Sequence, residues 1–138
     1  MKTPMTLLLF AVTVVTGLTG CSSATGPEMF ETSGSVHWEG APLKEGRITF
    51  RMLDGEGRVY SGPITNGAFN IETLPGEMRV EIIASRPIPG KFDHSNGEPA
   101  PIGEMYIPAK YNSRSELKYS VGPDAAPPDF NLISDSKT

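Results

Sequence analysis

Few side chains in this sequence are suited to metal binding or acid–base chemistry, since its 138 residues hold one cysteine and two histidines. The densest group is Asp93 and His94, with Glu98 and Glu104 a short way further along the chain. Such residues can bind a metal ion or transfer protons. Adjacent residues rarely chelate one ion together, and a zinc site requires three or four protein ligands, usually cysteine or histidine. We therefore predict no metal site and no cofactor.

The residue patterns of common nucleophilic and phosphate-binding enzymes are absent from the sequence. The serines lack a Gly-x-Ser-x-Gly elbow, and Gly55-Glu56-Gly57 is a turn signal without a phosphate-binding motif after it. His37 is predicted to lie on the polar face of a strand, beside Trp38. A pair of glycosidase carboxylates stays open, because a sequence does not show the distance between two acids. We predict no catalytic residues and a protein that is not an enzyme.

The one cysteine follows a segment with the features of an export signal. Lys2 supplies a positive charge, and residues 5–15 form an almost unbroken apolar run. This run is shorter than the roughly 20 residues that a membrane-spanning helix needs. Its length is typical of the apolar region of a signal peptide. It ends at Leu18-Thr19-Gly20-Cys21, and a single thiol cannot form an internal disulfide.

Leu18-Thr19-Gly20-Cys21 resembles the bacterial lipobox, in which an apolar residue and two small residues precede a cysteine. The resemblance implies cleavage between Gly20 and Cys21 and a diacylglycerol group on the Cys21 thiol. Residues 1–20 are then a lipoprotein signal peptide, and the mature protein is extracytoplasmic and lipid-anchored to a bacterial membrane. By resemblance to proteobacterial sorting, Ser22 favours the outer membrane. There are two alternatives. One is an ordinary secretory signal that leaves Cys21 as a free thiol, and the other is an uncleaved anchor.

The residues that follow Cys21 predict a short tether and then one acidic domain. Residues 21–33 are small and polar, contain Gly26-Pro27 and show no period, so they are predicted to form a lipidated flexible tether. The net charge is −4, and it becomes −5 once Lys2 leaves with the signal peptide. With no cluster of Lys or Arg, the domain lacks the surface of a nucleic-acid binder.

Between residues 34 and 133 the dominant period is two, which predicts strands with one buried face. The alternating sets are Val36/Trp38, Ile48/Phe50/Met52, Phe69/Ile71, Met78/Val80/Ile82/Ala84, Leu117/Tyr119/Val121 and Phe130/Leu132. The turn signals between them are residues 39–42, 54–57, 66–67, 75–76 and 122–123. Asn66-Gly67 is the strongest of these, because a type I′ hairpin turn needs φ > 0 twice. We predict an all-β fold, an antiparallel β-sandwich of about seven strands without a helix, followed by a polar tail at residues 134–138.

One long segment breaks the alternation. Residues 86–108 contain five prolines and three glycines, and we predict a long loop there. Within it Phe92, Asp93, His94 and Tyr106 are the candidate binding residues. Trp38 and Tyr119 are predicted to belong to the core.

The order of several short motifs also carries a family resemblance. They are Gly34-Ser35-Val36, Gly40-x-Pro42-Leu43, Thr65-Asn66-Gly67-x-Phe69, Leu74-Pro75-Gly76, Ile107-Pro108-x-Lys110-Tyr111-Asn112 and Asp129-Phe130-x-Leu132. This order resembles the small transthyretin-like, carboxypeptidase-regulatory-like lipoproteins of planctomycetal bacteria. The resemblance implies a transthyretin-like sandwich of seven or eight strands on the cell surface, with no assigned catalytic residues.

The expected function follows from the anchor, the fold and the missing catalytic set. We expect a non-catalytic binding or structural module of the cell envelope. Its partners would be the membrane, through the lipid on Cys21, and an envelope protein or polysaccharide. The alternatives are a cell-envelope enzyme or accessory subunit that acts on carbohydrate or peptide, and a carrier of a small ligand.

Overall fold

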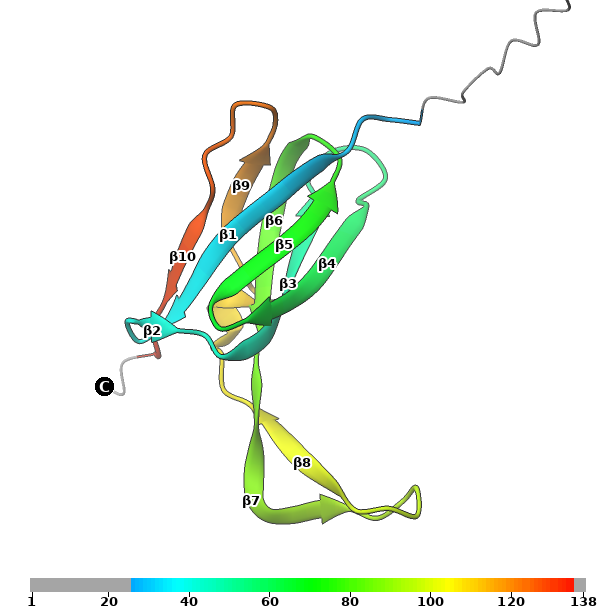
Figure 1. Cartoon of the computed structure of the whole chain (residues 1–138), viewed down its shortest axis with the longest axis vertical. Coiled ribbons are helices and arrows are strands. Elements are labelled where there is room, and N and C mark those ends of the chain that lie inside the picture. The colour runs from blue at the N-terminus through cyan, green and yellow to red at the C-terminus, as the bar shows by residue number, and fades with distance from the viewer. Residues whose placement is uncertain (1–25, 136–138) are drawn as a thin grey trace, which may run out of the picture.

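The computed structural model describes residues 26–135, which form an almost entirely β structure (Figure 1). The predictions for residues 1–25, including Gly20, Cys21 and the first part of the tether, lie outside the described residues. Within residues 26–135 no helix is long and apolar enough to cross a membrane. In chain order the elements are β1 (Phe30–Trp38), β2 (Ala41–Pro42), β3 (Glu45–Met52), β4 (Val59–Thr65), β5 (Ala68–Thr73), β6 (Gly76–Ile83), β7 (Ser85–Asp93), β8 (Ala100–Met105), the 3₁₀ turn η1 (Ala109–Tyr111), β9 (Lys118–Val121) and β10 (Asp129–Leu132).

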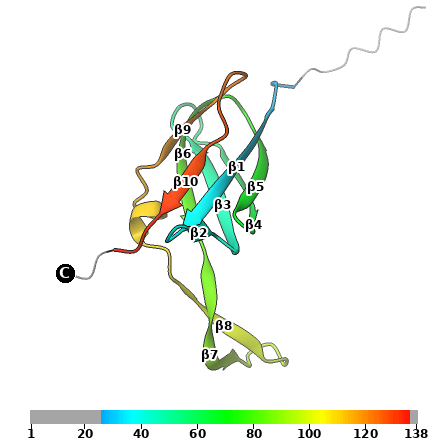
Figure 2. The ribbon, with the colours of Figure 1, turned by 60° about the vertical axis from the view of Figure 1, so that its left-hand side comes forward.

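Eight strands form one strongly curled sheet, whose strand order is β10-β1-β5-β4-β3-β6-β9, with β2 paired to β1. The curl places β1 and β5 across the core from β3 and β6 (Figures 1 and 2). The ring of Phe50 on β3 accordingly lies 5.9 Å from the ring of Phe69 on β5. The predicted all-β, sandwich-like fold is confirmed. One detail of the prediction is wrong, because β1 and β10 pair in parallel.

The core consists of the apolar residues that the alternation placed on one face of each strand. Phe50 and Val80, for example, are fully buried, and their neighbours along the strands point outward. Trp38 and Tyr119 are half-buried and pack against this core, as predicted. The buried apolar residues are Val36, Leu43, Ile48, Phe50, Ile64, Phe69, Ile71, Met78, Val80, Ile82, Ala84, Ile107, Val121, Phe130 and Leu132.

The first strand begins earlier than the sequence predicted. β1 starts at Phe30, so residues 30–33, which were assigned to the tether, pair with β5 in antiparallel register. Thr32 is even buried. The prediction was wrong here because this stretch pairs through its backbone, and its polar side chains show no apolar alternation.

The predicted turn chemistry is confirmed at Asn66-Gly67. Their φ angles are 50° and 78°, and the two residues join β4 to β5. Both φ values are positive, as a type I′ turn requires. The turn is also tied to the neighbouring loop, because the amide of Asn66 donates to the carbonyl of Lys44 at 2.7 Å and that of Gly67 to the carbonyl of Leu43 at 2.7 Å.

The segment predicted as a long loop is instead a two-stranded hairpin, β7–β8, that projects from the sandwich (Figures 1 and 2). Its register pairs Pro87 with Gly103 and Phe92 with Pro101, with an irregularity between Pro87 and Phe92. Prolines are tolerated here because each strand of a two-stranded sheet has a free edge, where a missing N–H breaks no ladder bond. Proline content alone therefore did not distinguish this hairpin from a loop.

After the hairpin the chain returns to the sandwich through Ile107, which is buried. The Asn112 side chain donates to the carbonyls of Ile107 at 3.0 Å and Pro108 at 3.1 Å, which fixes the turn around η1. The hydroxyl of buried Ser115 donates to the carbonyl of Val80 on β6. These two polar side chains hold the return segment against the sheet.

Candidate functional site

The structure separates the four candidate binding residues of the 86–108 segment. Phe92 and Asp93 end β7 near the tip of the hairpin, and His94 follows in the exposed turn. Tyr106 lies at the base of the hairpin, directly after β8. The four residues therefore do not form one site.

The acids of the hairpin have local partners. Asp93 accepts hydrogen bonds from the hydroxyl and the amide of Ser95, and these bonds lower the pKa of its carboxyl group. This is an arrangement in which an Asp side chain closes a turn. Glu104 accepts a hydrogen bond from Nε of Arg86 at 2.8 Å. In the described part of the chain no group of three or more His, Cys, Asp or Glu residues is placed to hold a metal ion.

Tyr106 is the one candidate that meets the body of the protein. Its ring contacts Trp38 at the end of β1 edge to face, with centroids 5.5 Å apart and planes at 69°. The guanidinium of Arg86 lies over the same ring, 5.5 Å from its centroid. Burial raises the pKa of the Tyr106 phenol, against a smaller opposing effect of Arg86. The hydroxyl is thus protonated at neutral pH and can donate a hydrogen bond.

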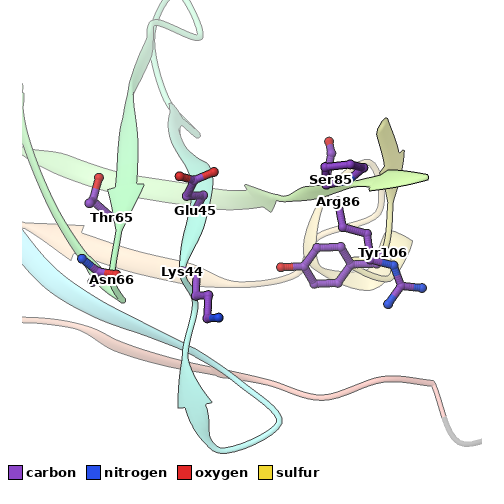
Figure 3. Close-up of a pocket in the computed structure, with 8 residues that line it drawn as sticks. Lys44, Glu45, Thr65, Asn66, Ser85, Arg86 and Tyr106 are labelled. Carbon is purple, nitrogen blue, oxygen red and sulfur yellow. The ribbon is translucent and has the colours of Figure 1, made fainter. Parts of the chain in front are cut away.

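A hollow of about 380 Å³ opens beside Tyr106, between the end of the sandwich and the base of the hairpin (Figure 3). We call it the rim hollow. Lys44 directly precedes β3 and Glu45 begins it, Thr65 and Asn66 come from the end of β4 and its turn, and the remaining residues come from the hairpin base. The Tyr106 hydroxyl points toward the Lys44 side of the hollow (Figure 3). The lining residues are Lys44, Glu45, Thr65, Asn66, Ser85, Arg86, Pro87 and Tyr106.

A second, more apolar hollow of about 230 Å³ adjoins the first, and we call it the aromatic niche. Lys44 and Tyr106 line both hollows, so the two share a wall. The lining residues of the niche are Trp38, Ala41, Pro42, Leu43, Lys44 and Tyr106. Together the rim hollow and the aromatic niche form the candidate site, which we call the rim site.

The rim site offers hydrogen-bonding groups of both kinds. Lys44 and Arg86 only donate, Glu45 accepts when ionised, and Thr65, Asn66 and Ser85 do both. Lys44 and Glu45 are exposed, and neither forms a salt bridge with another residue in the range 26–135. The arrangement is suited to hold a polar ligand against an aromatic wall.

Sequence reasoning identified two aromatic members of this site, but not the site itself. Tyr106 was proposed as a binding residue, and Trp38 was assigned to the core. The structure gives Trp38 both roles, since it packs on the core and lines the aromatic niche. No sequence signal indicated Lys44 or Arg86, because these isolated charges come together only through the curl of the sheet.

Comparisons with known proteins give no family for the chain. No protein-family model matches it, and no curated protein matches it. Among solved structures it is similar to a 9R-lipoxygenase from Cyanothece PCC8801, with 14% identity and a TM-score of 0.40. The match covers 77% of this chain and 16% of the lipoxygenase chain. A similarity this low carries no argument about function.

Proposed function

We propose that this chain is a lipid-anchored, extracytoplasmic lipoprotein of a bacterial cell envelope, and that its β-sandwich is a non-catalytic binding module. The anchor is supported by the lipobox-like junction Leu18-Thr19-Gly20-Cys21 and the signal-like segment before it. The all-β fold and the motif order between residues 34 and 132 support a relationship to the transthyretin-like lipoproteins.

The rim site is the observation that carries the binding function. It combines an aromatic wall with a polar wall in two adjoining hollows, and such a combination is typical of ligand sites. The hairpin acids do not form a cluster around a cleft, since Asp93 closes a turn and Glu104 pairs with Arg86. This dispersion favours binding over catalysis by carboxylates.

The position of the rim site suits a tethered module. β1 extends along the sandwich from Phe30, close to the first described residues, to Trp38 at the rim site (Figure 1). Nine residues of strand span about 30 Å. A membrane anchor on the N-terminal side would therefore place the rim site at the far end of the domain, facing away from the membrane surface.

The anchor is tested by the intact mass of the protein purified from its native membrane. We expect a chain that begins at Cys21 and carries acyl groups, and a Cys21→Ser variant that is neither acylated nor membrane-bound. Ser23→Ala, two residues away, is the matched control and should be processed like the natural chain. An unlipidated mass, or a mass that retains residues 1–20, would overturn the proposal.

A further inference from the structure

Building on the proposed binding function, we infer that the rim site binds a neutral saccharide. The first support is the aromatic niche, where Trp38, Pro42 and Tyr106 present apolar surface beside hydrogen-bonding groups. A sugar ring has an apolar C–H face and polar edges, so it can cover such a wall while its hydroxyls stay available. Aromatic side chains that combine an apolar body with a polar tip are suited to this contact.

The polar wall of the rim hollow matches the needs of hydroxyl groups. Each sugar hydroxyl donates one hydrogen bond and can accept others. Lys44 and Arg86 supply donors, Glu45 supplies an acceptor, and Ser85 and Asn66 supply both. A ligand with hydroxyls on several sides therefore finds complementary partners around the hollow.

The charges of the site cancel, which favours a neutral ligand. Lys44 and Arg86 are positive, and Glu45 on the same wall is negative. Glu104 holds Arg86 at 2.8 Å and offsets the second positive charge. A strongly anionic ligand would gain from the two cations and lose from the two acids, whereas a neutral polyol can use Lys44, Glu45 and Arg86, which line the rim hollow, as hydrogen-bonding partners.

The backbone of the site favours a saccharide over an extended peptide. A peptide that adds to a sheet needs a row of free backbone N–H and C=O groups along a strand edge. Along this wall the backbone already has partners, since Glu45 on β3 pairs with Thr65 on β4 and the carbonyls of Leu43 and Lys44 accept from the Asn66-Gly67 turn. On this β3–β4 wall the groups left for a ligand are side chains, and these match a polyol.

Trp38 is the one tryptophan of the chain, so its fluorescence reports directly on the rim site. We would titrate the full chain, in a detergent without a sugar headgroup, with cellohexaose and chitohexaose. We expect a saturable change in Trp38 emission and a dissociation constant at least tenfold larger in Lys44→Met and in Glu45→Gln. Both residues are exposed, so neither variant is expected to unfold the protein. Lys118→Met on β9 and Glu77→Gln on β6 are the matched controls and should bind like the natural chain.

The same titration with hexagalacturonate and with hexa-alanine tests the other ligand classes. A response to the acidic saccharide alone, to the peptide alone, or to none of the four probes would overturn the neutral-saccharide inference. Equal loss of binding in the control variants would also overturn it, because the rim site would then not be the binding surface. The anchor is judged separately by the intact mass, so failure of either proposal is distinguishable from failure of the other.

Discussion

The indole ring of Trp38 meets the phenol ring of Tyr106 edge to face, 5.5 Å between centroids. Trp38 ends the first long strand of the sandwich, and Tyr106 is the first residue after the hairpin. The contact therefore ties the base of the projecting hairpin to the body of the protein. Arg86 on β7 covers the Tyr106 ring, so this second contact holds the two sides of the hairpin base together.

Removal of the Tyr106 ring should destabilise the fold as well as the rim site. We expect Tyr106→Ala to lower the free energy of unfolding by about 1–3 kcal/mol, from lost aromatic contact and lost apolar burial. Tyr106→Phe keeps the ring and should lower it by less than about 1 kcal/mol. Urea unfolding monitored by the fluorescence of Trp38 measures both. Equal stability of the alanine variant and the natural chain would contradict the proposed tie.

The alternation of apolar residues made the core predictable, and its limits explain what was missed. In a strand with one buried face, apolar residues recur at every second position. Buried sets such as Met78/Val80/Ile82 could therefore be assigned from the sequence. β4 was missed because Gly62 and Pro63 interrupt its alternation. The hairpin was missed because nearly all its side chains are exposed and it pairs with no other strand of the described chain.

The rim site could not be predicted for a different reason. Its polar residues lie at strand ends and turns, where no periodicity marks them, and Lys44 is far from Arg86 in sequence. Only the curl of the sheet and the direction of the hairpin bring them together. Sequence reasoning placed Asp93 and His94 with Tyr106 because they share one segment, but an extended hairpin separates its tip from its base.

Gly34 is expected to tolerate no side chain. A Cβ at this position would lie 2.7 Å from the ring of Phe69 and still closer to the carbonyl oxygen of Pro128. Gly34→Ala must therefore push β1 away from its neighbours, and we expect it to lower the free energy of unfolding by about 1–3 kcal/mol. At Gly122, where a Cβ meets nothing within 4 Å, alanine should leave stability unchanged or raise it slightly. Thermal unfolding of the two variants gives the comparison, and equal melting temperatures would refute the close packing.

Residues 88–102, the outer part of the β7–β8 hairpin, should be dispensable for folding and for binding at the rim site. Pro87 pairs directly with Gly103, so residues 88–102 can be replaced by Asn-Gly without changing the base. The removed residues contribute nothing to the buried core, and we expect the free energy of unfolding to change by less than about 1 kcal/mol. Phe50→Ala, in contrast, should lower it by about 3–5 kcal/mol. A trimmed protein that no longer binds cellohexaose or chitohexaose would move the binding surface to the tip around Phe92, Asp93 and His94.

Asp129 should make the pairing of β10 with β1 sensitive to acid. Its carboxylate accepts from the Ser35 hydroxyl at 2.7 Å and from the Asn131 amide at 3.2 Å, and lies 3.0 Å from Nδ1 of His37. The bond from Ser35 is the main cause of a lowered pKa of Asp129. A folded-state pKa below the unfolded value, which is near 3.9, stabilises the fold above about pH 4. This stabilisation is lost as the pH falls through the folded pKa.

The acid sensitivity is measured by urea unfolding at a series of pH values between about 2 and 5, which spans the carboxyl range. The stability of the natural chain should fall toward the acid end, and Asp129→Asn should flatten that slope. Asp124→Asn, an exposed acid in the segment before β10, is the control. Identical slopes for Asp129→Asn and the natural chain would show that the three hydrogen-bonding groups do not stabilise the ionised form.

A substitution at Thr73 is expected to raise the free energy of unfolding, whereas most of the substitutions above lower it. The residue ends β5, is fully buried, and its hydroxyl has no hydrogen-bond partner among residues 26–135. A buried hydroxyl without a partner destabilises a fold by about 1–3 kcal/mol, and valine has nearly the same shape and suits a strand equally well. We therefore expect Thr73→Val to raise the free energy of unfolding by about 1 kcal/mol, measured by urea unfolding. Thr49→Val on β3, which is half-buried, is the control and should change it by less than about 0.5 kcal/mol. Lower stability of Thr73→Val would mean that the Thr73 hydroxyl makes a hydrogen bond in solution. Its partner would then lie near Phe30, because Thr73 on β5 pairs with Phe30 on β1.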